Sequence, residues 1–248
     1  MKKNIVWFAL SAILLTAVLS SCKKGASGCR PIRFYTTDSF SVSSLSYDGD
    51  HVIRVDSRLK AGTSQGYSLY HYSATGKISG FEDYDSTGVT LRKTEYIFDG
   101  NDRVISEYYY VKTGSTLPLS AHYSYEYYMN GNLQKLTRYD NGTTVLETHY
   151  YTDYDANGNN TKGYDNNNLG VTRDTFFYTY DDHPNFWSFY FLKGPQNKNN
   201  PLSYTYKPTV GPVFIDTYTY LYNGQGYVTY QHESADGDNL YVDYSCGN

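Results

Sequence analysis

The stretch DYDANGNN near the middle of the chain carries the residue types of a calcium loop. Asp153, Asp155 and Asn157 fall at the first, third and fifth positions of an EF-hand loop, and Gly158 falls at its sixth. The twelfth position, where an EF-hand has a bidentate Glu, is Tyr164. Asp, Asn and Gly together are also typical of tight turns. We therefore predict a turn here and no metal site.

A pair of carboxylates could also cleave glycosidic bonds, but such a pair is defined by its separation in space. The candidates are Glu82, Glu95, Glu107, Glu126, Glu147 and Glu233. The sequence contains no G-x-S-x-G elbow, no Walker loop and no H-E-x-x-H motif. Its six histidines are not spaced as metal ligands, and matched register predicts His122 and His149 on opposite faces of a sheet. We predict a protein that is not an enzyme and needs no cofactor.

The elements that carry these residues follow from an internal repeat. An aromatic residue followed by a polar turn recurs seven times, at spacings of 25, 26, 30, 26, 26 and 42 residues. The chain has 31 tyrosines, and most of the repeat markers are tyrosines. The markers are Tyr47, Tyr72, Phe98, Tyr128, Tyr154, Tyr180 and Tyr222. Further turns fall between them, so the unit is about 26 residues with two strands and two turns.

The stretches between turns alternate in polarity with a period of two, as half-buried strands do. Tyr123, Tyr125 and Tyr127 share one face of such a stretch, and His122 and Ser124 share the other. The sequence therefore predicts an all-β fold, an antiparallel meander of about 14–16 short strands. Sheets of more than about 10 strands tend to curl, so we expect a barrel-like closed sheet. An open twisted single-layer sheet is the alternative.

The N-terminus resembles a bacterial lipoprotein signal. Lys2 and Lys3 precede an apolar run, and Ser20 and Ser21 stand before Cys22 as in a lipobox. We predict a signal peptide over residues 1–21, lipid attachment at Cys22, a tether over 22–30 and one all-β domain over 31–248. Acyl chains would then hold the protein on a membrane.

Two further cysteines, Cys29 and Cys246, lie near opposite ends of the folded region. An even pair in an exported protein suggests a disulfide. Such a bond would bring the first and last strands together. Two free thiols are the alternative.

The charge balance restricts the partners. Removal of Lys2 and Lys3 with the signal leaves 19 basic against 25 acidic residues, a net charge of −6. No basic patch for nucleic acid is present, so we expect none as a partner. The expected partners are the membrane, through the lipid, and either a glycan or another envelope protein.

The tyrosine-rich units resemble the YD repeats of Rhs-type proteins. A closer similarity covers most of the mature chain and rests on the lipobox, the hairpins and the late stretch YTYDDHPNFW. These resemble the Bacteroidetes lipoprotein family known as domain of unknown function 4595. Asn185-Phe186-Trp187 stands where that family usually has Asn-Pro-Phe. The resemblance implies a porin-like barrel at the cell envelope and implies no activity.

The last interval of 42 residues includes a proline-rich insertion. Long insertions on a rigid scaffold often bind ligands. The aromatic residues beside it form a candidate ligand-binding surface: Trp187, Phe189, Tyr190 and Phe191. Alternatively, these rings fill one end of the barrel.

We predict a non-enzymatic binding or scaffold lipoprotein of the cell envelope, at the outer membrane on its periplasmic or surface face. A glycan-binding or glycan-hydrolysing accessory lipoprotein is the alternative.

Overall fold

The computed structural model describes residues 29–36, 41–59, 61–185, 195–235, 237 and 239–246. The predicted signal peptide, Cys22 and the aromatic residues at 187–191 lie outside these residues. Within the described part of the chain, no helix has the length and apolar character needed to cross a membrane.

The described residues form an all-β fold of sixteen strands. They are β1 (Cys29–Thr36), β2 (Ser41–Asp48), β3 (His51–Leu59), β4 (Ser64–Tyr72), β5 (Ile78–Asp85), β6 (Thr90–Phe98), β7 (Val104–Val111), β8 (Leu119–Tyr127), β9 (Leu133–Tyr139), β10 (Val145–Tyr154), β11 (Asn160–Asn167), β12 (Thr172–Pro184), β13 (Asn199–Pro208), β14 (Phe214–Tyr222), β15 (Val228–Glu233) and β16 (Asn239–Cys246).

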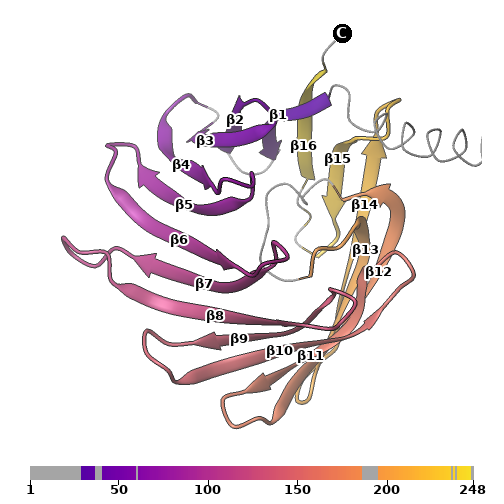
Figure 1. The fold of residues 1–248 in the computed structure, drawn as a ribbon. Coiled ribbons are helices and arrows are strands. Elements are labelled where there is room, and N and C mark those ends of the chain that lie inside the picture. The colour runs from indigo at the N-terminus through magenta and orange to yellow at the C-terminus, as the bar shows by residue number, and fades with distance from the viewer. Residues whose placement is uncertain are drawn as a thin grey trace, which may run out of the picture.

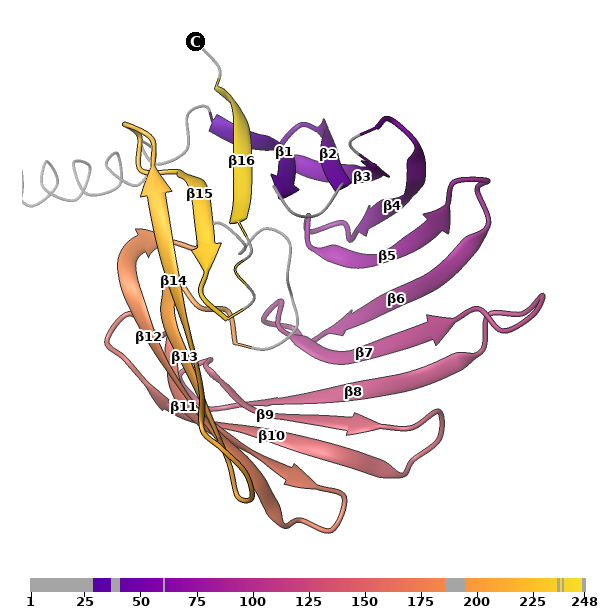
Figure 2. The same cartoon turned by 180° about the vertical axis from the view of Figure 1, so that it is seen from behind.

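The sheet is a closed antiparallel meander, in which each strand pairs with its neighbours in sequence and β1 pairs with β16 (Figures 1 and 2). Cys29 and Cys246 form a disulfide across this seam. The predicted closed barrel and the predicted disulfide are therefore confirmed. The first strand begins at Cys29, two residues before the predicted domain start, because Cys29 and Arg30 already pair with β16.

The meander gives the barrel two distinct ends. We call one the loop end: it carries Cys29, Cys246, the described residues 185 and 195–198 between β12 and β13, and the turns 49–50, 73–77, 99–103, 128–132, 155–159 and 223–227. The other end, which we call the far end, carries the remaining turns between strands. An even number of antiparallel strands places both ends of the barrel sheet at the loop end.

Five of the six loop-end turns, all except 49–50, share one hydrogen-bond pattern. In the turn predicted from DYDANGNN, the backbone N–H of Asp155 donates to the carbonyl of Asn159, and that of Gly158 donates back to the carbonyl of Asp155, both at 3.0 Å. The Asp155 carboxylate also accepts from the backbone N–H of Asn157 at 2.9 Å. Gly158 has φ of 87°, which favours glycine. The predicted turn is therefore confirmed.

A series of tyrosine hydroxyls holds the strands together at the loop end. Each lies near the loop end of an even-numbered strand and donates to a backbone carbonyl of the preceding strand. The chain connects each such pair of strands only at the far end. The tyrosine hydroxyls therefore hold the two strands together at the loop end, where the chain does not connect them. The pairs are Tyr47–Pro31, Tyr72–Val52, Tyr127–Val104, Tyr154–Leu133, Tyr180–Asn160 and Tyr220–Pro201.

This series corrects one repeat marker. Tyr222 keeps the marker position, because it pairs with Val228 across its turn, although Tyr220 makes the hydrogen bond of this series. Tyr127 makes such a hydrogen bond, where the sequence pattern had selected Tyr128. Tyr127 pairs with Leu133 across its turn just as Tyr72 pairs with Ile78. The shift of one residue would place the marker on the opposite face of the strand.

The core lies on the inner face of the barrel in two clusters. Tyr123, Tyr125 and Leu136 belong to one, and Phe34 and Val242, beside the seam, belong to the other. The predicted face of Tyr123 and Tyr125 is confirmed, since both are buried.

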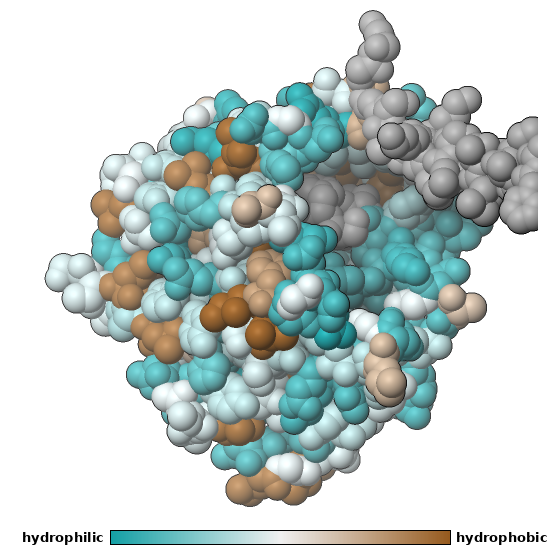
Figure 3. All heavy atoms as spheres, viewed as in Figure 1, coloured by the Kyte–Doolittle hydropathy of each residue, from teal (hydrophilic) through white to brown (hydrophobic). Residues whose placement is uncertain are grey.

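Polar and charged side chains, with apolar ones scattered among them, cover the face of the molecule that Figure 3 shows. The outer face of the barrel carries ion pairs such as Lys135–Glu126. His122 stacks on Tyr139 on this face, with ring centroids 4.3 Å apart. His149 lies on the inner face, 2.5 Å from Asp165. The prediction that His122 and His149 face opposite sides of the sheet is confirmed.

Candidate binding site

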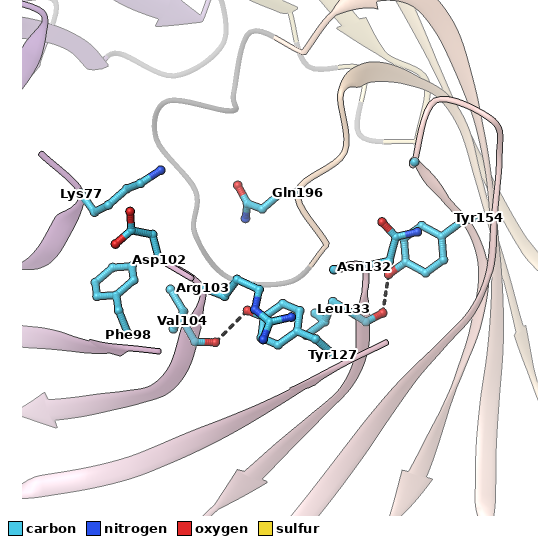
Figure 4. Close-up of a pocket in the computed structure, with 12 residues that line it drawn as sticks. Lys77, Phe98, Asp102, Arg103, Val104, Tyr127, Asn132, Leu133, Tyr154 and Gln196 are labelled. Atoms are coloured by element: carbon cyan, nitrogen blue, oxygen red, sulfur yellow. Dashed lines mark hydrogen bonds between the residues drawn. The ribbon is translucent and has the colours of Figure 1, made fainter. Parts of the chain in front are cut away.

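A pocket of about 210 Å³ opens at the loop end, where sister turns of successive hairpins lie side by side (Figure 4). Its wall combines charged, amide and aromatic side chains from four turns and the adjoining strand ends, together with Gln196. The lining residues are Lys77, Phe98, Asp102, Arg103, Val104, Tyr127, Gly131, Asn132, Leu133, Tyr154, Gly158 and Gln196.

The turns hold their side chains in place through local hydrogen bonds. Asp99 begins the turn 99–103, and its carboxylate accepts from the backbone N–H groups of Asn101 at 2.8 Å and Arg103 at 3.0 Å. The Arg103 guanidinium also donates to Asp99 at 2.6 Å. These hydrogen bonds hold the pKa of Asp99 below its usual value, and the one from the Arg103 backbone N–H has the largest effect.

Aromatic rings form the floor of the pocket. The Arg103 guanidinium lies 4.7 Å from the ring centroid of Tyr127. The hydroxyls of Tyr127 and Tyr154 donate to backbone carbonyls, which fixes both rings (Figure 4). Burial raises the pKa of Tyr127 to about 12, although Arg103 acts against the increase. These two hydroxyls are structural donors rather than acid–base groups.

Asp102 has an unusual backbone conformation. Its φ is 59°, and no other described non-glycine residue has a positive φ. The equivalent position in the four sister turns is glycine: Gly76, Gly131, Gly158 and Gly226. The left-handed region costs a non-glycine residue free energy, though less for Asp than for most. The 99–103 turn therefore carries a carboxylate at a position where its four sister turns have no side chain.

Asparagine side chains hold residues 197–199, at the start of β13, beside the pocket. The side chain of Asn159 is fully buried. Its carbonyl oxygen accepts from the backbone N–H groups of Lys198 at 2.7 Å and Asn199 at 3.0 Å, and its amide donates to Asp155 at 2.8 Å. Asn159 therefore joins the 155–159 turn to residues 198 and 199 at the start of β13.

A second set of amide hydrogen bonds completes this attachment. The backbone N–H of Asn160 donates to Asn197 at 2.8 Å, and Asn200 donates twice to the Asp181 carboxylate, at 3.0 and 3.2 Å. Sequence reasoning missed this network. The available signal was the recurrence of an Asn-Asn pair at 159–160 and 199–200.

A cluster of charges lines the inner wall over β9 to β12. Glu147 lies 3.1 Å from Arg138, 3.6 Å from Arg173 and 3.7 Å from His149. The other ring nitrogen of His149 lies 2.5 Å from Asp165. Burial alone would raise the pKa of Glu147, but the hydrogen bond from Arg138 and the nearby positive charges lower it below its usual value.

The structure divides the six candidate glutamates between the two faces. Glu95 and Glu126 form outer ion pairs with Lys93 and Lys135, at 2.7 and 2.6 Å, and Glu82 is also on this face. The inward glutamates are Glu107, Glu147 and Glu233. Among the residues that the structure describes, no group of three or more His, Cys, Asp or Glu side chains could hold a metal ion.

Together these features define the class: a closed sixteen-stranded antiparallel meander barrel with a polar pocket at one end. No protein-family model matches the chain. No curated protein matches it either. These two comparisons therefore do not support the resemblance to the lipoprotein family, and only the porin-like fold that it implied is borne out, by solved structures.

Two solved structures are similar to this barrel. A porin-like protein from Bacteroides uniformis ATCC 8492 has 11% sequence identity and a TM-score of 0.56, over 89% of this chain and 97% of that one. A porin-like protein from Bacteroides vulgatus ATCC 8482 has 11% identity and a TM-score of 0.55, over 86% of this chain and 98% of that one. At such low identity the likeness establishes the fold alone: this is a porin-like barrel.

Proposed function

We propose that this protein is a lipid-anchored, non-enzymatic binding protein of the bacterial cell envelope, at the outer membrane. The observation that carries the proposal is the loop-end pocket, whose charged and amide side chains stand on a rigid, closed frame. Such a pocket on a rigid scaffold is the usual form of a binding site for a small ligand.

The lipobox at Cys22 supports the anchor, and the barrel geometry adds a restriction. Cys29 begins β1 at the loop end, seven residues after Cys22. Seven residues span at most about 25 Å even when fully extended. Acylation of Cys22 would therefore keep the pocket-bearing end of the barrel close to the membrane surface.

The outer face supports anchoring by lipid rather than insertion of the barrel. A membrane-spanning barrel presents an apolar band to lipid. Here the outer face carries ion pairs, including Arg54–Asp56 at 2.7 Å and Lys135–Glu126 at 2.6 Å. Charges at such positions are costly in a bilayer.

Membrane fractionation of a Cys22→Ala variant tests the anchor. We expect the variant to leave the membrane fraction, while a Ser20→Ala control, which keeps a small residue in the lipobox, stays in it. Unchanged detergent partitioning of Cys22→Ala would contradict the anchor.

A glycan-hydrolysing role is the second candidate, and one observation favours it. Glu147 and Asp165 flank His149 on the inner wall, so two carboxylates face the interior of the barrel close to each other. A panel of chromogenic glycosides separates the two roles. Turnover that disappears in Glu147→Gln would establish the hydrolase and refute the non-enzymatic proposal.

A further inference from the structure

We propose that the loop-end pocket binds one neutral pyranose ring, either a free sugar or the terminal residue of a glycan. This inference rests on the proposed binding function and names the ligand class of the same pocket. It is argued from the size of the pocket, its polar groups, its aromatic floor and the strained residue Asp102.

The size of the pocket matches a single ring. Sites for drug-sized ligands usually have volumes of about 300–1,000 Å³. The pocket here measures about 210 Å³, so its ligand is smaller. A monosaccharide unit fits this limit, whereas a longer glycan would extend out of the pocket.

The polar groups are complementary to hydroxyls. Asp102 supplies an acceptor and Lys77 a donor, and their side chains point into the same space (Figure 4). Lys77 forms no ion pair with another described residue, and Asp102 accepts a long hydrogen bond of 3.5 Å from Thr75. A hydroxyl both donates and accepts, so neighbouring hydroxyls on a sugar ring can bond to Asp102 and Lys77 together.

The pair of opposite charges gives a charged ligand no net attraction. An anion that binds Lys77 would be repelled by Asp102, and a cation that binds Asp102 would be repelled by Lys77. The third charge in the wall, Arg103, is already paired with Asp99 at 2.6 Å. The amides of Asn132 and Gln196, which also line the pocket, each offer both a donor and an acceptor. The wall as a whole suits a neutral, hydroxyl-rich molecule.

The floor of the pocket suits the C–H face of a pyranose. Phe98, Tyr127 and Tyr154 present rings there, and Leu133 adds apolar surface. Because the two tyrosine hydroxyls are bound to carbonyls at 2.7 and 2.5 Å, their rings are already ordered before a ligand arrives. Rigid aromatic side chains give contact area at low cost in conformational entropy.

The strain at Asp102 is consistent with a functional carboxylate. The other two sister positions that line the pocket are Gly131 and Gly158, so Asp102 alone among these three presents a side chain to a ligand. Residues in unfavourable backbone regions tend to occur at ligand sites, where the interaction offsets the strain.

Met129 provides a reporter for the test. The chain contains two methionines, Met1 and Met129, and Met129 is fully exposed at the tip of the 128–132 turn, beside the pocket. We suggest labelling the full chain with methyl-¹³C methionine, in a detergent without a sugar head group. The titrants are methyl glucoside, methyl galactoside, methyl mannoside and N-acetylglucosamine, with glucuronic acid and glucosamine as charged counterparts.

We expect at least one neutral sugar to shift the Met129 methyl signal in a saturable way, with weaker binding of its charged counterparts. Lys77→Met and Asp102→Asn should each raise Kd about tenfold or more, because each removes a charged hydrogen-bond partner. Asn tolerates the left-handed region, so Asp102→Asn keeps the turn. Lys112→Met, the matched substitution at the far end, should leave Kd unchanged.

Two outcomes would overturn the inference: no Met129 shift with any neutral sugar up to saturating millimolar concentrations, or Kd unchanged in both pocket variants. Release of free sugar in the same samples would instead refute the non-enzymatic proposal, so the two failures are distinguishable. Circular dichroism of each variant shows whether the barrel is intact.

Discussion

Tyr127 donates its hydroxyl to the backbone carbonyl of Val104 at 2.7 Å, joining β8 to β7 at the loop end. The chain connects these two strands only at the far end. The hydrogen bond thus links β7 and β8 at the loop end, as the backbone links them at the far end. Repeated around the barrel, this arrangement gives a structural role to six of the 31 tyrosines.

Removal of this hydroxyl is expected to destabilise the barrel. Tyr127→Phe keeps the ring but leaves the Val104 carbonyl without this partner, which should lower the free energy of unfolding by about 1 kcal/mol. Denaturant unfolding measures the change. Tyr139→Phe is the matched outer-face control, and there we expect less than about 0.5 kcal/mol. Equal effects in the two variants would contradict a specific role for the inner hydroxyl.

Loss of the seam disulfide should have the larger effect. Cys29 and Cys246 are 217 residues apart in the chain. A cross-link enclosing such a loop restricts the unfolded chain by about 5 kcal/mol in the chain-entropy model. We expect Cys246→Ser to lose a large part of that stability, as measured by denaturant unfolding without reductant. Peptide mapping of the non-reduced wild type should recover the Cys29–Cys246 peptide, and two alkylated thiols would contradict the bond.

Replacement of the strained residue should stabilise the fold. Glycine at position 102 relieves the left-handed strain of Asp102, so Asp102→Gly should raise the free energy of unfolding by up to about 1 kcal/mol. Gly226→Asp, the reverse change in a sister turn away from the pocket, should lower it. A thermal melt compares both with the wild type. If Asp102→Gly is destabilising, the side chain must contribute more to folding than its backbone strain costs.

The buried tyrosines predict loss of stability in alkali. Burial raises the pKa of Tyr47 to about 12, partly opposed by Arg30, and burial likewise raises the pKa of Tyr127 to about 12. In the unfolded chain tyrosine titrates near pH 10. Between these values the unfolded state binds fewer protons than the folded state, so the free energy of unfolding falls as pH rises.

Unfolding in denaturant at neutral pH and at about pH 11 should show this decrease, together with tyrosinate absorption that appears on unfolding. Tyr127→Phe should reduce the pH dependence, because it removes one of the shifted groups. A free energy of unfolding that stays constant across this range would show that the inner hydroxyls titrate normally.

Much of the fold followed from local patterns in the sequence. The period-two alternation around Tyr125 predicts the inner face, and the turn residues around Asp155 predict where strands end. The paired cysteines and the large number of strands together predict closure. These signals are local, or are fixed by covalent chemistry, and so a single sequence contains them.

The site was less accessible to sequence reasoning. Lys77, Asp102 and Asn132 line one pocket because three successive hairpins stand side by side at the loop end, and that depends on the registers of all the strands between them. The inward contact of Glu147 with Arg173 depends on how β9 to β12 pair, including a register shift beside Asp174. The predicted aromatic surface at 187–191 lies outside the described residues and stays a prediction.

The antiparallel seam between β1 and β16 also limits how a protein of this design can change in size. Closure of a meander by an antiparallel pair requires an even number of strands, so a single added strand would point the last one the wrong way. A repeat unit of two strands satisfies this parity automatically. Duplication or deletion of one unit would therefore widen or narrow the bore in steps of one hairpin, while the two termini stay adjacent at the same rim.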